Sequence, residues 1–141
     1  MLVGIDIIEN DRFAQAMKRR PRLIARVFTR REQDYCLAKA SPARHFAARF
    51  AAKEAVGKAL GTGVPAWQEI EIISSASGQP RVCVSGGMEA AAHAAGAGAI
   101  SLSLSHSNFA TVAVAVAEKR NPDAGLWTLD ETRNPKKQLD S

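Results

Sequence analysis

The segment from Phe46 to Gly63, FAARFAAKEAVGKALGTG, restricts the fold of this chain more than any other part of the sequence. On a helical wheel with about 100° per residue, its phenylalanines form one apolar stripe and its alanines form another on nearly the opposite side. A helix that is apolar on two sides is normally buried. This helix nevertheless contains four charged residues, Arg49, Lys53, Glu54 and Lys58. Because a buried charge is costly unless it is paired or meets a charged ligand, these residues are candidates for a function.

Local signals place this helix in an α+β fold. Ser41 and Pro42 at its start and Gly61 at its end predict a helix over residues 42–60. Alternating side chains predict a strand over residues 2–8, a β-hairpin formed by residues 69–74 and 81–85, and a second hairpin that turns at residues 106–108. Shorter helices are expected before Pro21 and over residues 22–28, 30–39 and 88–95. The expected architecture is antiparallel strands around a long helix.

Two of the shorter helices begin with residues that favour capping. Asn10 or Asp11 can cap the first helix, which Pro21 interrupts. Thr29 and Glu32 form the pattern of a capping box, in which each side chain bonds the backbone of the other residue. The sequence therefore predicts a helix start just after Thr29.

The net charge of +5 is concentrated in one segment. Residues 12–31 contain eight lysines and arginines and no acidic residue, so the remainder of the chain is net acidic. A local basic patch predicts an acidic partner at one surface. The alternative is a basic nucleic-acid-binding module that uses this segment on phosphates. Because only 6% of the residues are aromatic and no nucleic-acid reader motif is present, we expect no nucleic-acid partner.

Asp6 and Glu54 are a candidate metal site. Asp6 lies in a predicted strand, where acids are depleted, and Glu54 lies on the long helix. Two carboxylates on rigid elements suit Mg²⁺, which prefers oxygen ligands and usually also takes phosphates and waters. Lys53 and Lys58 flank Glu54 and can neutralise phosphate oxygens. Two simpler interpretations stay open: a salt bridge between Glu54 and Lys58 at i, i+4 spacing, or a Lys53 side chain that reaches along the phenylalanine rings to water.

The segments VGIDIIENDRF and FAARFAAKEAVGKALGTG resemble the two signature motifs of the holo-acyl-carrier-protein synthases, the small bacterial type of the 4'-phosphopantetheinyl transferase superfamily. The similarity extends over about residues 2–118. It implies a 4'-phosphopantetheinyl transferase-like fold. It also implies Mg²⁺-dependent transfer of phosphopantetheine from coenzyme A to a serine of apo acyl carrier protein, with release of 3',5'-ADP, in fatty acid biosynthesis.

The resemblance implies roles for individual residues. Asp6 and Glu54 hold Mg²⁺, and Lys58 neutralises or protonates the leaving phosphate, so these three residues form the expected catalytic set. Residues expected to line the coenzyme A site besides Lys58 are Arg49, Lys53, Gly61, Thr62, Gly63, Pro80, His106 and Ser107, the last two at the 3'-phosphate. The general base stays open between Glu54, Asp34 and a metal-bound water.

The resemblance also implies two kinds of protein partner. The acidic carrier protein is expected to dock on the basic segment, and the enzyme is expected to form a homotrimer with each site at a subunit boundary. The expected docking residues are Arg12, Arg19, Arg22 and Arg26, which share an arc of about 80° if the helical phase continues through Pro21.

The sequence predicts one catalytic domain, residues 1–118, and a polar tail, residues 119–141, that is extended or disordered. No apolar segment approaches the ~20 residues of a membrane span, and the first ten residues do not resemble a signal peptide. The two cysteines lie in no metal-binding pattern and are expected to be reduced. A cytoplasmic location without membrane contact is therefore expected.

Overall fold

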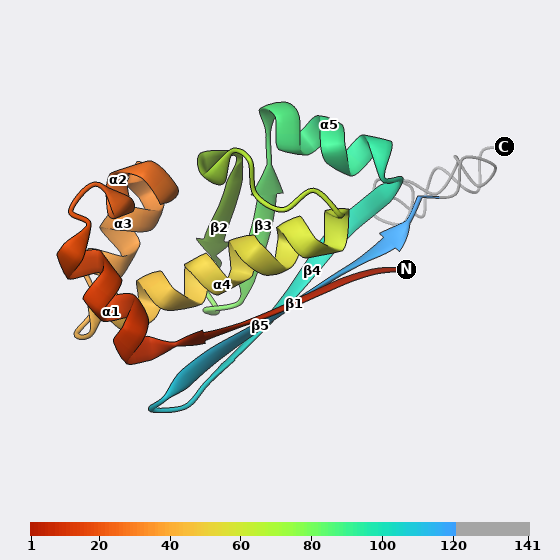
Figure 1. The fold of residues 1–141 in the computed structure, drawn as a ribbon. Coiled ribbons are helices and arrows are strands. Elements are labelled where there is room, and N and C mark those ends of the chain that lie inside the picture. The colour runs from red at the N-terminus through yellow and green to blue at the C-terminus, as the bar shows by residue number, and fades with distance from the viewer. Residues whose placement is uncertain (121–141) are drawn as a thin grey trace, which may run out of the picture.

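The computed structural model describes residues 1–120, in which two groups of strands and several helices surround one long helix (Figure 1). The elements in chain order are β1 (Leu2–Glu9), α1 (Asn10–Arg19), α2 (Leu23–Val27), α3 (Arg30–Leu37), α4 (Pro42–Leu60), the 3-10 helix η1 (Trp67–Glu69), β2 (Ile70–Ser74), β3 (Pro80–Val84), α5 (Gly86–Ala94), β4 (Ala97–His106) and β5 (Ala110–Lys119). The predicted α+β class is confirmed, and the helix predicted over residues 42–60 coincides with α4.

The predicted tail lies outside the described residues from residue 121 onward. No helix of the described chain combines the length and apolarity that a membrane crossing requires.

The strands form two antiparallel sheets on different sides of α4. One sheet has the order β1-β5-β4, and the other is the hairpin β2-β3 (Figure 1). The inward face of β5 carries only small buried side chains, which lets the sheet approach the alanine stripe of α4 closely. These alanines of β5 are Ala113, Ala115 and Ala117. The main core therefore lies between α4 and the larger sheet.

Gly4 brings β1 into backbone contact with α4. A Cβ atom at this position would overlap the carbonyl oxygen of Ala55 and the backbone nitrogen of Ala59. Any side chain here would push the strand away from the helix, so glycine sets the distance between β1 and α4. Asp6 follows two residues later on the same face of the strand and thus lies beside the last turns of the helix.

The outward face of β1 is apolar. Val3, Ile5 and Ile7 are 57%, 58% and 67% exposed. An antiparallel sheet with one solvated face normally carries polar residues on that face. The outward face of β1 is therefore an apolar surface that no part of residues 1–120 covers.

The local signals for helix ends have mixed outcomes. The capping box is confirmed: Thr29 Oγ1 accepts a hydrogen bond from the Glu32 backbone at 3.2 Å, and Glu32 Oε1 accepts one from the Thr29 backbone at 2.9 Å. Gly61 ends α4 in the left-handed conformation with φ of 75°, as predicted. The expectation for α1 is wrong, because Glu9 occupies the cap position without a side-chain bond and Asn10 is the first helical residue.

Replacing Gly4 with alanine is expected to lower the free energy of unfolding by about 2 kcal/mol or more, because the new methyl group overlaps backbone that cannot rotate away. The measurement is chemical denaturation of the purified variant. Gly98→Ala in β4 is the matched control, since its Cβ would lie 3.2 Å from the Glu118 carbonyl oxygen and needs only a small shift. Equal stability losses in the two variants would contradict the account of the contact between β1 and α4.

Candidate active site

The three residues predicted to be catalytic lie together between β1 and α4. Lys58 Nζ donates hydrogen bonds to Asp6 Oδ1 and to the Ile5 carbonyl oxygen, each at 3.0 Å. The Asp6 side chain is only 15% exposed, whereas that of Lys58 is 52% exposed. Glu54 lies one helical turn before Lys58. The fold thus gathers two carboxylates and a solvent-accessible ammonium group from distant parts of the sequence.

Glu54 is poorly compensated in this cluster. Burial raises the pKa of its carboxyl group, the neighbouring Asp6 carboxylate raises the pKa further, and Lys58 opposes both effects. The alternative of a salt bridge between Glu54 and Lys58 is wrong, because among residues 1–120 the ion-pair partner of Lys58 is Asp6. Among residues 1–120, no ion pair neutralises the Glu54 carboxylate.

The two carboxylates fit a divalent cation. A cation between them would relieve the repulsion that raises the pKa of Glu54. Within the part of the chain that the structure describes, no third histidine, cysteine, aspartate or glutamate joins the pair. A cation held here would take its other ligands from substrate and water, which is usual for Mg²⁺.

Lys53 lies elsewhere and has its own partners. Its side chain is completely buried, and its Nζ lies 2.7 Å from Glu32 Oε1, 2.9 Å from the Val27 carbonyl oxygen and 3.0 Å from the Trp67 carbonyl oxygen. These three acceptors use all the donors of an ammonium group. The prediction that Lys53 lines the coenzyme A phosphates is therefore corrected, and the alternative that it reaches water is also wrong.

Arg49 belongs to a second cationic cluster. Its guanidinium carbon lies 3.9 Å from the centre of the Tyr35 ring, and its Nη2 donates to Ser74 Oγ at 2.8 Å. Lys39 Nζ lies 4.6 Å from the same ring centre, and the His45 ring meets Tyr35 edge-on at 6.0 Å. Arg49 is 4% exposed, and its Nε makes no hydrogen bond within the described residues.

The electrostatics of this second cluster favour an anion. Burial lowers the pKa of His45, and the charges of Arg49, Lys39, His106 and Arg44 lower it further. The Ser74 hydrogen bond and the nearby cations lower the pKa of Tyr35 against the opposing effect of burial. Every charged group that shifts the pKa of His45 is a cation. Within residues 1–120, no ion pair joins Arg49, Lys39 or His45 to a carboxylate, so the cluster has excess positive charge.

The structure does not bring Arg49 to the carboxylates of Asp6 and Glu54 within residues 1–120. At about 100° per residue, Arg49 and Glu54 point roughly 140° apart around α4. Their contacts agree with this separation, because Arg49 meets β2 through Ser74 whereas Lys58 meets β1 through Asp6. The residues predicted to bind one ligand therefore lie on different sides of the helix.

The remaining predicted ligand-site residues lie at three places on the surface, where Pro80 is half-buried and the others are exposed. Gly61, Thr62 and Gly63 follow α4, and the backbone nitrogens of Thr62 and Gly63 donate to the Gly57 carbonyl oxygen at 3.1 and 3.2 Å. Pro80 lines a hollow of about 510 Å³ between β3 and β4. His106 and Ser107 are exposed where β4 turns toward β5.

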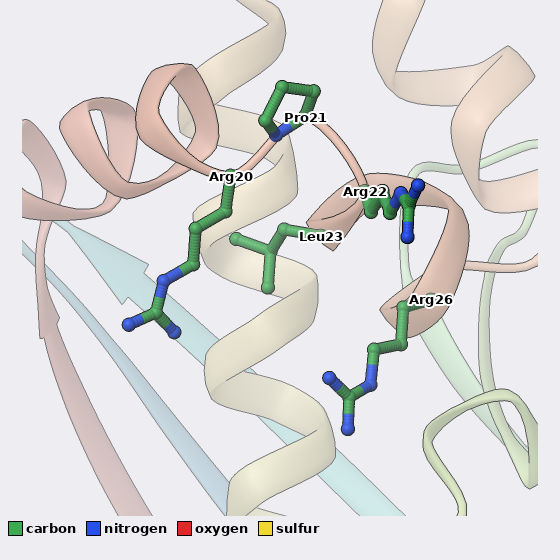
Figure 2. Close-up of a pocket in the computed structure, with 5 residues that line it drawn as sticks. All are labelled: Arg20, Pro21, Arg22, Leu23 and Arg26. Atoms are coloured by element: carbon green, nitrogen blue, oxygen red, sulfur yellow. The ribbon is translucent and has the colours of Figure 1, made fainter.

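The predicted docking arginines are only partly grouped. Arg22 and Arg26 line a hollow of about 390 Å³ together with Arg20, Pro21 and Leu23 (Figure 2). Figure 2 shows the side chains of Arg20 and Arg26 extending to the same side of the connection between α1 and α2. Arg12 lines a different hollow of about 370 Å³ beside β1 and α1, and Arg19 lines neither of these two.

The sequence interpretation missed several residues of these clusters. Glu32 appeared only as a capping residue, although its second oxygen accepts a hydrogen bond from the Ile72 backbone at 3.0 Å. Tyr35 gave no signal, because its contact with Arg49 joins two helices. Arg20 was missed because Pro21 breaks the helical phase used to group the arginines. Asp34, a candidate base, is exposed and pairs with Arg30 at 3.3 Å within α3.

Comparison with known proteins defines the family. The profile of the 4'-phosphopantetheinyl transferase superfamily matches residues 2–117. A Moorella thermoacetica holo-[acyl-carrier-protein] synthase is 58% identical over 81 residues, which cover 56% of this chain and 63% of that relative. The fold matches the holo-[acyl-carrier-protein] synthase of Neisseria meningitidis with a TM-score of 0.77 and 30% identity, over 84% of this chain and all of that one.

A second solved structure is that of a Bacillus anthracis holo-(acyl-carrier-protein) synthase in complex with CoA (3',5'-ADP). It has a TM-score of 0.70 and 30% identity, over 84% of this chain and 96% of that one. The chain belongs to the 4'-phosphopantetheinyl transferase superfamily. Its relatives there are the holo-[acyl-carrier-protein] synthases, so the type expected from the sequence motifs is confirmed.

Glu54 and Glu32 are expected to respond oppositely to replacement by glutamine. Glu32→Gln leaves the buried Lys53 charge unpaired and should cost about 3–5 kcal/mol of stability. Glu54→Gln removes a charge that burial and Asp6 disfavour, so at neutral pH the melting temperature should stay the same or rise.

The stability difference between Glu54→Gln and the wild type depends on pH. Because the pKa of Glu54 is raised in the folded chain, its destabilising effect is present above that pKa and absent below the ordinary glutamate pKa. The difference in melting temperature between this variant and the wild type should therefore become smaller at acidic pH. Thermal melts without metal or coenzyme A at several pH values measure both effects. A large stability loss in Glu54→Gln would show that Glu54 is structurally paired.

Proposed function

We propose that this protein transfers the 4'-phosphopantetheine group of coenzyme A to a serine of apo acyl carrier protein, in fatty acid biosynthesis. The observation that carries the proposal is the cluster of Asp6, Glu54 and Lys58, which stand in the two motifs that gave the family resemblance. Family membership and the relative solved with CoA (3',5'-ADP) support it.

The residues of the cluster suit phosphoryl transfer. Asp6 and Glu54 would hold Mg²⁺, which when bound would neutralise charge on the pyrophosphate of coenzyme A. The serine hydroxyl gives its proton to a general base and its oxygen forms a bond to the β-phosphorus, while the bond between that phosphorus and the bridging oxygen of 3',5'-ADP breaks. Lys58, whose side chain is 52% exposed, can turn from Asp6 toward the leaving phosphate and neutralise or protonate it.

A second copy of the chain would complete the site. Arg49 and its cationic neighbours suit a phosphate of the same coenzyme A, yet Arg49 lies on another side of α4 from Glu54. Two copies joined side by side can place the Arg49 cluster of one beside the carboxylates of the other. The exposed Val3, Ile5 and Ile7 offer an apolar surface for this contact. We propose a homotrimer, the assembly that the family resemblance implies.

The hollow formed by Arg20, Arg22 and Arg26 would receive the acidic carrier protein (Figure 2). Arg12 and Arg19, also predicted, would extend this surface along α1. Arginine-rich surfaces steer acidic partners and fix their orientation. The same arginines could contact nucleic acid, but nothing else in the structure or the comparisons favours that function.

Cys36 and Cys83 are both free, which fits the reducing cytoplasm that we propose as the location.

Incubation with coenzyme A, Mg²⁺ and a bacterial apo acyl carrier protein is expected to add one phosphopantetheine to the carrier, detected by its mass. Lys58→Met should fold normally and lower kcat by about 100-fold or more, because it removes charge from the leaving phosphate. Glu54→Gln should lose metal-dependent turnover while staying folded. An unchanged carrier mass with several apo carriers, together with tight RNA or DNA binding, would favour the nucleic-acid alternative.

Reversal of Arg22 to glutamate is expected to raise the KM for the carrier about three- to tenfold and to weaken its salt dependence, with the KM for coenzyme A unchanged. Arg30→Glu is the matched control, because it makes the same charge change in the same basic segment but outside the hollow. Steady-state kinetics at two salt concentrations measure both constants. An equal loss of coenzyme A affinity would assign the hollow to the nucleotide site instead.

A further inference from the structure

The turn between β4 and β5 is held by one residue from the opposite end of the chain. Asn10 Nδ2 donates to the carbonyl oxygens of Ser107 at 2.9 Å and Asn108 at 3.4 Å. The Asn10 backbone nitrogen donates to the Phe109 carbonyl oxygen at 2.8 Å. Three successive carbonyl groups of the turn are thus bound by Asn10.

The orientation of the Asn10 side chain is fixed from its other end. Its Oδ1 accepts a hydrogen bond of 2.7 Å from the hydroxyl group of Thr111, which is completely buried. Rotating the amide by 180° would place its oxygen against the carbonyl oxygens of Ser107 and Asn108, which can only accept hydrogen bonds. The side chain of Asn10 therefore has one favourable orientation, in which every polar atom faces the turn or Thr111.

The turn also has bonds of its own. Ser107 Oγ accepts hydrogen bonds from the backbone nitrogens of Phe109 and Ala110, each at 3.2 Å, and the Ser107 nitrogen donates to the Ala110 carbonyl oxygen at 2.9 Å. Among residues 1–120 the Ser107 hydroxyl group accepts these two bonds and donates none. The backbone of the turn is therefore rigid, while a hydroxyl donor stays available.

Rigidity and exposure occur together at this turn. His106, Ser107 and Asn108 are exposed, and Phe109 is 82% exposed. A solvent-exposed turn contributes little to the core, so its many hydrogen bonds serve the placement of its side chains more than the stability of the domain. Figure 1 shows that the hairpin of β4 and β5 extends beyond α4 at this end, next to the start of α1.

We propose that Asn10 is a positioning residue of the coenzyme A site, which holds His106 and Ser107 where they bind a phosphate of coenzyme A. Asn10 does not touch the ligand and acts through the turn. The proposal rests on the proposed function. It also explains why Asn10 does not cap α1, since its side chain is fully used by the turn and Thr111.

The test compares Asn10→Asp with Asn108→Ala. Asn10→Asp keeps the size of the side chain and the acceptor for Thr111, but its second oxygen opposes the carbonyl groups of Ser107 and Asn108. Titration calorimetry with 3',5'-ADP is expected to give an approximately tenfold weaker Kd, and the KM for coenzyme A should rise similarly. The KM for the carrier should change less than twofold. Asn108→Ala, which keeps all the Asn10 bonds, should match the wild type.

Two further measurements separate positioning from general damage. In a His106→Ala background, Asn10→Asp should add little to the loss of 3',5'-ADP affinity, because both changes act through the same turn. Hydrogen exchange of the Phe109 and Ala110 amides should accelerate in Asn10→Asp, and this readout does not depend on activity. If Asn10→Asp proves unstable, Asn10→Ser is measured in the same way, since it adds no charge.

The outcomes distinguish this proposal from the proposed function. Wild-type affinity for 3',5'-ADP in folded Asn10→Asp, or additive losses in the double variant, would overturn the positioning role. Equal weakening of coenzyme A and carrier, with a lower melting temperature, would also overturn it and assign Asn10 to stability alone. A wild-type protein that neither binds 3',5'-ADP nor modifies a carrier would instead overturn the proposed function.

Discussion

The buried ion pair of Glu32 and Lys53 fixes the framework on which the rest of the structure depends. The two charged groups lie 2.7 Å apart with both side chains fully buried, and their other hydrogen bonds reach Val27, Trp67 and Ile72. These bonds join α2, α3, η1 and β2 to one point of α4. Because a buried charge that loses a partner is costly, no single element can move away from this point without a large free-energy loss. The position of the basic hollow relative to α4 follows from this constraint.

The four charges that α4 carries after Phe46 therefore serve three different purposes. Lys53 is compensated within the chain and holds the framework. Glu54 and Lys58 face β1, where the Asp6 carboxylate leaves Glu54 uncompensated and suits a cation. Arg49 faces β2 and belongs to a cluster with excess positive charge. The helix can be buried on most sides because each charge meets either a partner or a place where an ionic ligand can bind.

The success of the sequence predictions depended on the distance along the chain between the interacting residues. The capping box at Thr29, the glycine stop of α4 and both hairpins depend on near neighbours, and they were confirmed. The partners of buried charges depend on tertiary packing instead. A helical wheel predicts the side of the helix on which Lys53 lies. It predicts neither how deeply this side chain is buried nor that Glu32 of another helix is its partner. The assignment of Lys53 to coenzyme A was therefore contradicted. Lys58 likewise pairs with Asp6, 52 positions away, and not with its helical neighbour.

The two faces of β1 connect the candidate site to the proposed assembly. Asp6 lies on the inward face beside Lys58, while Ile5 and Ile7, its immediate neighbours, lie on the outward face with more than half of their surface exposed. A strand is stiff along its length, so a contact that covers Ile5 and Ile7 also restrains the Asp6 backbone between them. The same strand is held on its inner side by the backbone contact of Gly4 with α4. In the proposed trimer, in which the Arg49 cluster of a neighbour would complete the site, burial of the apolar face would thus also steady the Asp6 carboxylate.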